Sequence, residues 1–314
     1  SARRWVLDSD SECVDFTPLR FASEMRNTTI HLMGDSTMMQ LFTALVCSLY
    51  KLSYSEATVH FKHHQGGTNE VSSKIFNRKT CPFAKKFCHF SVGTFQLPEL
   101  GLKIQLDYMT KLKNSVGIQY MIRENHIRPT DFLVFGFGLH YNARESFLDA
   151  INNLATSVRN LDGASPLPGL FYMETFPTHF ASASKGKEKD KGVEKERGLD
   201  PQTQVQGDGV GVGYFNNEVA SPACVPLNSS NPDEYRRHAW RTHLEPLEAH
   251  SDKLQVVRIS DPLLSQFDAH IDGDSVLTHF SRADCVHFCA SSGVFEYLKT
   301  TFFNHFLMSR RNRG

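Results

Sequence analysis

The chain lacks both a long hydrophobic run and an excess of charge of either sign. No stretch of about 18 apolar residues occurs, so the sequence predicts no membrane-spanning segment. The 34 basic side chains equal the 34 acidic ones. This balance gives no support for nucleic acid or an anionic membrane surface as a partner. The chain begins at Ser1 without a methionine. We therefore expect a trimmed or mature fragment, whose signal or membrane anchor, if one precedes it, is not visible.

Internal repeats and paired Cys-x-x-Cys motifs are also missing. The 314 residues, 40% of them hydrophobic, are enough to bury a sizeable core. We predict a single domain over 1–314 with an insertion at about 184–213. In that insertion, ten of the thirteen residues from 185 to 197 are charged, and glycines follow. Such a composition predicts a mobile surface loop.

Short apolar runs with β-branched residues alternate with apolar residues at helical spacing, which predicts an α/β fold with a mostly parallel sheet. Alternation over 102–108 indicates a half-exposed strand, and 51–100 are expected to form strands and loops. The remaining strands are expected at 28–33, 131–137, 170–174 and 254–259. Helices are expected from 37 to about 49, from a cap at Asn142 to about 161, over 232–249, and over 295–306.

Two distant segments carry groups suited to nucleophilic catalysis. Gly34-Asp35-Ser36 follows an apolar strand and precedes a helical pattern, a geometry that lifts the Ser36 hydroxyl off the strand end. Near the other end of the chain, Asp284 and His287 are three residues apart, about one helical turn, so both can face the same way. A serine needs a base, and the base an orienting acid. Ser36, His287 and Asp284 supply these three groups.

Simpler interpretations of these residues stay open. Ser36 could only cap the following helix. Asp284 and His287 could form a surface helix pair, or His287 could be a histidine satisfied in the core. Asp35 is expected to shape the turn by accepting backbone hydrogen bonds. A structural zinc site is the rival for the C-terminal segment, with ligands His279, Cys285, His287 and Cys289.

The cysteines and sequons give weaker indications. Asn27 and Asn228 each begin a sequon that permits N-glycosylation. Cys81 and Cys88 are close enough to close a local loop. Cys47 falls on the predicted buried face of a helix, where we expect a free thiol.

Four blocks together resemble the PC-esterase branch of the SGNH hydrolase superfamily, over roughly 28–306. They run from Gly34 to Gln40, from Asp131 to Tyr141, from Glu174 to Phe180, and from Asp284 to Cys289. The resemblance implies a three-layer α/β/α domain and acyl transfer, most often of acetyl, to or from carbohydrate hydroxyls through an acyl-serine. It favours a glycan O-acetyltransferase over an O-acetylesterase, with a glycan substrate, an acyl donor of unknown identity, and no metal or other cofactor.

The resemblance also implies a location and a set of disulfides. Members of the branch act in the lumen of the secretory pathway, where disulfides persist, so we expect a Golgi, endoplasmic reticulum or extracellular location. A membrane contact would come only through an anchor outside this sequence. The implied disulfide pairs join Cys224 to Cys285 and Cys13 to Cys289.

The expected oxyanion hole departs from the family pattern. Met39 stands where these proteins usually have an arginine, and a methionine cannot donate a hydrogen bond. Gly136 occupies the position of a frequent asparagine. The remaining donors are the backbone N–H of Ser36 and those of Gly136 or Gly138, with Asn142 as a further candidate.

Four other residues belong to the candidate pocket or its surroundings. His140 and His179 follow predicted strands, so their loops should border the pocket, although a packed role for His179 is an equal alternative. Glu174 could hold either histidine, and Gln40 could order the catalytic turn. Two further functions stay open: a catalytically weak or inactive glycan-binding homologue, and a lipid or thioester hydrolase of the wider superfamily.

Overall fold

The computed structural model describes most of the domain, in several stretches. These are 14–50, 52, 58–63, 90–112, 118, 122, 127–141, 143–161, 166–179, 224, 226–227, 232–271, 284–288 and 293–313. Within them, only the backbone is described for 58–63, 90–91, 232–234, 267, 271 and 284–287. The predicted insertion at 184–213 lies outside these residues.

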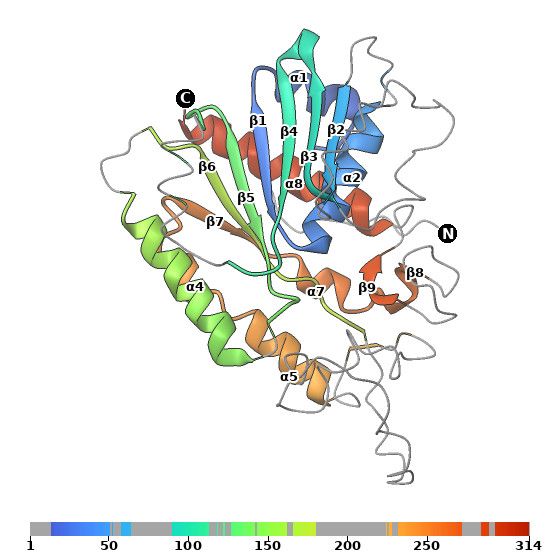
Figure 1. Ribbon diagram of the computed structural model, residues 1–314, viewed down its shortest axis with the longest axis vertical. Helices are drawn as coiled ribbons and strands as arrows, with labels where there is room; N and C mark the ends of the chain where they lie inside the picture. Colours follow the sequence, from blue (N-terminus) through green and yellow to red (C-terminus); the bar gives the residue numbers. More distant parts are fainter. Residues whose placement is uncertain are drawn as a thin grey trace.

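A seven-stranded sheet forms the centre of the molecule (Figure 1). Its order is β2 (Thr58–His63), β3 (Phe90–Leu97), β4 (Leu102–Tyr108), β1 (Thr29–Gly34), β5 (Phe132–Gly136), β6 (Gly169–Met173) and β7 (Leu254–Val257). The strands from β4 to β7 run parallel, whereas β3 is antiparallel to both β2 and β4. The predicted mostly parallel sheet is therefore confirmed.

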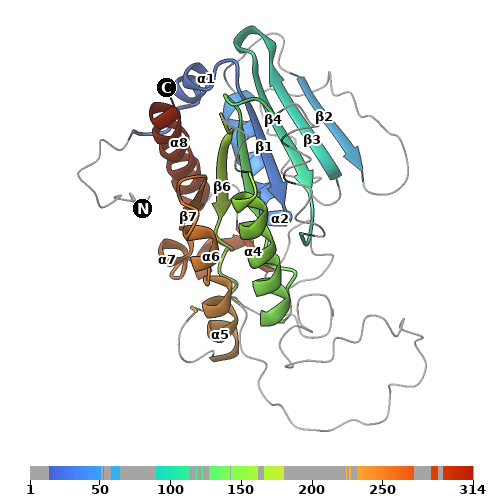
Figure 2. The same ribbon diagram turned by 90° about the vertical axis from the view of Figure 1, so that its left-hand side faces the viewer.

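Helices cover both faces of this sheet, which gives three layers (Figure 2). The first face packs on α1 (Pro18–Glu24), α2 (Ser36–Tyr50) and α8 (Gly293–Arg313). The second packs on α4 (Arg144–Arg159), α5 (Pro232–Arg241) and α6 (Glu245–Glu248). The predicted α/β/α fold is confirmed. Among the described residues, no helix is both long enough and apolar enough to cross a bilayer.

Shorter elements complete the chain. They are the 3₁₀ turns η2 (Pro98–Leu100) and η5 (Phe267–Ala269), helix α7 (Ser260–Leu263), and a separate ribbon of β8 (His270–Ile271) and β9 (Asp284–Phe288). Figure 1 shows this ribbon and α7 beyond the lower edge of the sheet, where β1 and β5 end. The ribbon thus lies at the carboxyl edge, where α/β folds place their sites.

Apolar side chains explain why β1 and β5 take the middle of the sheet. Ile30 and Leu32 of β1 pack under α2 and α8, and Leu133 and Phe135 of β5 pack under α4. All four are fully buried. A run that buries both faces favours a central parallel strand, and this pattern is what made the strands predictable from sequence.

Three expectations about helices are wrong. The helix expected over 232–249 is broken into α5 and α6, because Pro246 lacks an N–H and restricts the residue before it. Helix α4 has Ala143 at its N-cap, one residue after the expected Asn142, and no side-chain cap bond. Asp284 and His287 lie on strand β9 and not on a helix.

Candidate active site

The turn between β1 and α2 is held by a close approach of two strands. Gly34 ends β1 and pairs with Gly136 of β5. A β-carbon added at Gly34 would lie 1.8 Å from the Gly136 carbonyl oxygen. The N–H of Asp35 donates to that same oxygen at 3.1 Å. Only glycine permits this approach, so the turn needs a glycine at position 34.

Asp35 caps helix α2. One carboxylate oxygen of Asp35 accepts from the Thr37 N–H at 3.1 Å and from the Thr37 hydroxyl at 2.7 Å. The other accepts from the Leu139 N–H at 3.4 Å, which ties the turn to the loop after β5. The expectation that Asp35 shapes the turn is confirmed. Because Asp35 fills the capping role, the alternative that Ser36 merely caps the helix is wrong.

The Ser36 side chain is buried and has no assigned structural task. Ser36 is 8% exposed, and its Oγ has no hydrogen-bond partner in the described part of the chain. A buried hydroxyl left without a partner costs about 1–3 kcal/mol. It lies in the first turn of α2, where backbone N–H groups and the helix dipole favour negative charge. Such surroundings are compatible with an attacking serine, which also needs a base.

A fixed loop follows β5 beside this turn. Its first carbonyl, that of Phe137, accepts from the Tyr172 hydroxyl at 2.7 Å and from the Thr175 hydroxyl at 3.2 Å. Gly138 fits against Thr175, since a β-carbon there would lie 1.9 Å from the Thr175 Oγ1. The candidate donor Gly138 is therefore held in a rigid loop whose next residue, Leu139, bonds to Asp35.

Arg241 holds the other end of the loop, a role that the sequence did not reveal. Arg241 is buried at the end of α5, and its guanidinium donates to the carbonyls of Leu139 at 3.0 Å and Tyr141 at 3.4 Å. It also lies over the Trp240 ring, with 5.2 Å between the guanidinium carbon and the ring centre. No local pattern marks such a contact, because the partners are about a hundred residues apart in sequence.

Gly136 stands where the family often has an asparagine, and the side chains of Met38 and Met173 fill the space beside it. A β-carbon at Gly136 would lie 2.4 Å from the Met38 terminal methyl and 3.0 Å from that of Met173. The Gly136 carbonyl is already engaged with Asp35. Met39, at the position of the family's arginine, is buried in the apolar core beneath α2. Neither residue brings a polar side chain to the turn, so neither can replace the side-chain donors of the family pattern.

Strand β9 brings the Asp284–His287 segment to helix α2. The side-chain amide of Gln40 donates to the carbonyl of Phe288 at 2.9 Å. Gln40 is one helical turn after Ser36, on the same side of α2, and Phe288 is the residue after His287. The two ends of the candidate triad thus belong to elements in direct contact. The side chains of Asp284 and His287 lie outside the described residues.

The pairing of β9 with β8 is irregular at this point. His270 pairs with Phe288, yet the next residue, Ile271, pairs with Asp284. Residues 285–287 therefore bulge from the ribbon. In a regular strand, positions three apart face opposite sides, but a bulge breaks that alternation. The expectation that the spacing acts through a helical turn is wrong, because Asp284 and His287 lie on an irregular strand.

His179 is packed beneath this bulge. It is fully buried, and its Nδ1 lies 2.6 Å from the Nε2 of His270 while its Nε2 lies 3.0 Å from the Leu264 carbonyl. Because a carbonyl only accepts, Nε2 of His179 carries the proton and His270 donates to Nδ1. Burial lowers the pKa of His179 to about 4, so the ring is neutral. Of the two alternatives, the structure has the packed, hydrogen-bonded histidine.

The His179–His270 pair supports the segment that carries His287. The His270 ring stacks on the Phe288 ring, with 4.2 Å between ring centres and 21° between the planes. Phe288 also contacts the Phe176 ring edge-on at 5.8 Å. The loop after β6 is thereby joined to the residue next to His287.

Glu174 does not hold a histidine, so that expectation is wrong. One of its oxygens accepts from Arg258 at 2.8 Å, and the other from the N–H groups of Ile259 and Ser260 and the hydroxyl of Ser260. Burial alone would raise the pKa of Glu174, but these hydrogen bonds outweigh it and lower the pKa. Glu174 is thus an ionised anchor that fastens the end of β6 to the start of α7.

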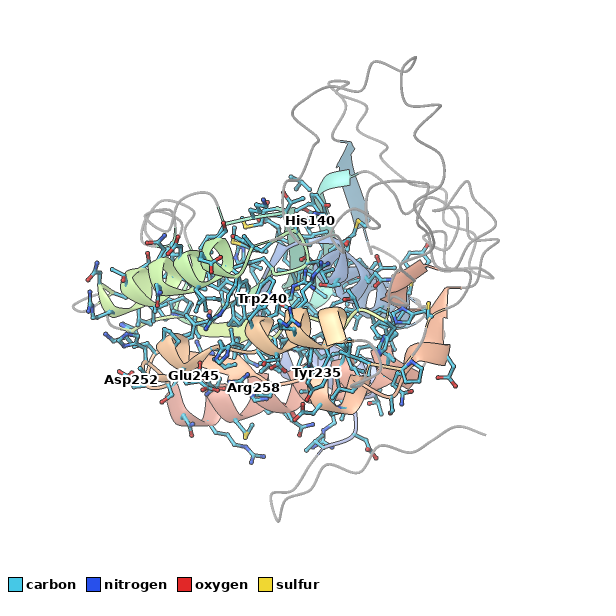
Figure 3. The ribbon with its side chains drawn as sticks, turned by 90° about the horizontal axis from the view of Figure 1, so that it is seen from below. His140, Tyr235, Trp240, Glu245, Asp252 and Arg258 are labelled. Carbon is cyan, nitrogen blue, oxygen red and sulfur yellow. The ribbon has the colours of Figure 1, made fainter. Side chains whose placement is uncertain are left out.

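His140 and Asn142 complete the sequence candidates. Figure 3 views the molecule from the carboxyl edge of the sheet and shows His140 on the same edge as Trp240 and Tyr235 of α5. His140 is half-buried in the turn that follows Leu139. Asn142 lies outside the described residues. The predicted roles of both in a pocket stay predictions.

Two cysteines are described, and each corrects or extends an expectation. Cys47 takes part in a disulfide, so the expectation of a free thiol is wrong. Cys224 is also disulfide-bonded, as the resemblance implied. The side chain of its expected partner, Cys285, lies outside the described residues, as do Cys13, Cys81, Cys88 and Cys289.

The described residues do not test the alternative of a structural zinc site. Among the residues with described side chains, no group of three or more histidine, cysteine, aspartate or glutamate residues could hold a metal ion. The four proposed zinc ligands all lie outside that set.

No protein-family model matches the chain, and a search of curated proteins finds no significant match. The fold and the serine turn rest on the geometry above. The resemblance to the PC-esterase branch stays a prediction from the four sequence blocks.

Proposed function

We propose that the protein is a serine-dependent acyltransferase or esterase that acts on O-acyl groups, most often acetyl, of a carbohydrate. One observation carries the proposal. Ser36 is a buried serine at the strand–helix turn, its hydroxyl is unpartnered among the described residues, and the cap role it could have filled belongs to Asp35. The Gln40–Phe288 bond supports the choice of His287 as base, because it joins the helix of Ser36 to the strand of His287.

The proposed chemistry has two steps that use the same groups. In the first, Ser36 Oγ attacks the carbonyl carbon of the acyl donor, His287 takes the serine proton, and then delivers it to the departing oxygen. In the second, a sugar hydroxyl or water attacks the acyl-serine, and His287 transfers its proton to Ser36. Asp284 would orient the imidazole. The backbone N–H groups of Ser36 and Gly138 would stabilise the oxyanion, where losing one donor typically costs about 10²–10³ in rate.

Intact-mass spectrometry after incubation with an activated acetyl ester tests the proposal. We expect a gain of about 42 Da, one acetyl group in place of one hydrogen, that disappears in Ser36→Ala. His287→Ala should slow the gain strongly, while His243→Ala, an exposed histidine, serves as the matched control. No adduct and no turnover with several acyl donors would overturn the proposal and favour the inactive glycan-binding homologue.

Adding acceptors then separates the two enzyme classes. Faster loss of the acetyl adduct in the presence of oligosaccharides, with acetylated sugar as product, would identify a transferase. Loss to free acetate at a rate that sugars do not change would identify an esterase. Preference for long acyl chains would instead favour a lipid or thioester hydrolase. The proposed secretory location is chemically consistent with the disulfides of Cys47 and Cys224, since these persist in oxidising compartments.

A further inference from the structure

The middle strand of the sheet carries polar side chains on one of its faces. Strand β1 is the fourth of the seven strands. A central parallel strand covered by helices is normally apolar on both faces. On the face of β1 away from α2 and α8, however, His31 stands between Thr29 and Met33. The paired positions on β4 are Lys103, Gln105 and Asp107.

These side chains line a cavity on this face of the sheet, which we call the sheet-face cavity. Its volume is about 570 Å³, within the range of about 300–1,000 Å³ that is usual for small-molecule sites. Ile127, Arg128, Asp131 and Leu133 complete its described lining. The cavity lies along β1, β4 and the start of β5, beside the part of the sheet that α4 covers.

Among the lining residues, His31 is the one that most directly indicates a ligand. Its side chain is only 9% exposed, it lines the cavity, and the structure gives it no hydrogen bond within the described residues. Burial, partly offset by the charge of Asp131, lowers the pKa of His31 to about 4, so the imidazole is neutral at physiological pH. A neutral imidazole offers one donor and one acceptor. Both groups are available to a ligand or to ordered water in the cavity.

The charges around the cavity cancel. Arg128 and Asp131 form an ion pair at 2.9 Å, and the cation of Lys103 acts on both His31 and Asp107. The Gln105 side-chain amide donates to Asp107 at 3.1 Å, and burial raises the Asp107 pKa. Two basic groups therefore face two acidic ones. The described part of the lining therefore has no net charge that would favour a phosphate, a polyanion or a cation.

We propose that the sheet-face cavity binds a neutral, hydroxyl-rich small molecule, a sugar unit or short oligosaccharide. A hydroxyl group both donates and accepts, which suits the imidazole of His31 and the free carbonyl capacity of Gln105. Met33, Ile127 and Leu133 supply the apolar surface that the C–H faces of a sugar require. The site is built from strand faces and not from the Ser36 turn, so it does not rest on the proposed catalytic function.

Methyl NMR on the full chain tests this inference. The probes are xylotriose, cellotriose and chitobiose up to about 20 mM, a range that detects weak binding, with phosphate and acetate as charged comparisons. We expect saturable shifts at the methyl groups of Met33, Ile127 and Leu133, and none at Ile151 of α4. The affinity should not change between about 0.05 and 0.5 M NaCl, because no net charge is neutralised.

Two variants locate the binding. His31→Leu and Gln105→Leu should each weaken sugar binding by about tenfold, the effect of losing one or two buried hydrogen bonds. His243→Leu, at an exposed position, is the matched control. Thermal melting verifies that each variant is folded. The inference is overturned if no sugar gives saturable shifts, if only phosphate or acetate does, or if both leucine variants bind the sugars as the wild type does.

Discussion

Gln40 donates a hydrogen bond of 2.9 Å to the carbonyl oxygen of Phe288 and thereby joins helix α2 to strand β9. Gln40 is one helical turn after Ser36, and Phe288 is the residue after His287. The oxygen of that side-chain amide, Gln40 Oε1, is buried without a partner among the described residues. The Gln40 nitrogen thus has a hydrogen-bond partner, whereas the Gln40 oxygen has none among the described residues. We infer that Gln40 is a positioning residue, which sets the distance between nucleophile and base.

Replacing Gln40 by methionine should lower the rate of acylation at Ser36 by about 10- to 100-fold, because displacing a catalytic group by an ångström has effects of that size. The KM for the acyl donor should change little, since Gln40 contacts no substrate in the proposal. The labelling rate of Ser36 with a fluorophosphonate measures the effect. Gln266→Met is the control, since that side chain bonds only its neighbour Ser265 among the described residues. An unchanged rate would exclude the positioning role without affecting the assignment of Ser36.

Asp35 and Ser36 should have opposite effects on stability. Asp35→Ala removes the cap of α2 and the bond to Leu139, so we expect the free energy of unfolding to fall by about 2 kcal/mol. Ser36→Ala removes only an unpartnered hydroxyl and should leave stability unchanged or slightly higher, while acylation is lost. Urea unfolding of both variants measures this. A loss of stability in Ser36→Ala as large as in Asp35→Ala would contradict this prediction and would indicate that Ser36 has a structural role.

Two glycines at the turn should differ in their tolerance of alanine. At Gly34 the new methyl would meet the backbone carbonyl of Gly136, which cannot move without breaking the sheet. We expect a loss of about 3 kcal/mol or failure to fold. At Gly136 it would meet the ends of Met38 and Met173, which are flexible, so the loss should be below about 1.5 kcal/mol. Thermal or urea unfolding compares them, and equal losses would contradict the close-approach argument.

Stability should rise with pH between about 4 and 6.5. Burial lowers the pKa of both His31 and His179 from 6.5 to about 4. The unfolded chain therefore binds more protons than the folded one in this window. Their contribution is complete above pH 6.5 and is lost as the pH falls through about 4. Urea unfolding at several pH values should show a slope that decreases in His31→Leu by about 1.4 kcal/mol per pH unit.

The control for this pH dependence is His243→Leu, whose side chain is about half exposed. Its slope should equal that of the wild type. If His31→Leu also keeps the wild-type slope, then His31 titrates in the folded protein as it does in the unfolded chain, and its burial as a neutral group is wrong.

The sequence predicted the sheet well because its strands bury both faces. Runs such as Phe132–Gly136 admit few other placements. The contact between Gly34 and Gly136 was not predicted, because it joins two strands that are distant in sequence. Gln40 could also be found, since its spacing from Ser36 places both on one side of a helix.

Other features depend on tertiary contacts that leave no local signal. The segment from Asp284 to Phe288 pairs with β8 and bonds to α2, so it forms a strand although its spacing also suits a helix. The anchoring of the 137–141 loop by Arg241 and Tyr172 joins distant parts of the chain. The neutral state of His179 likewise comes from its burial between elements that only the fold brings together.

The central claim is that Ser36 and His287 meet at the carboxyl edge of the sheet. A crystal structure of the protein, free and after reaction with a fluorophosphonate, measures the distance from Ser36 Oγ to the nearer imidazole nitrogen of His287. The account predicts about 2.6–3.2 Å in the free protein and the phosphonyl group on Ser36. A separation above about 6 Å in both structures, with Ser36 unmodified, would contradict it.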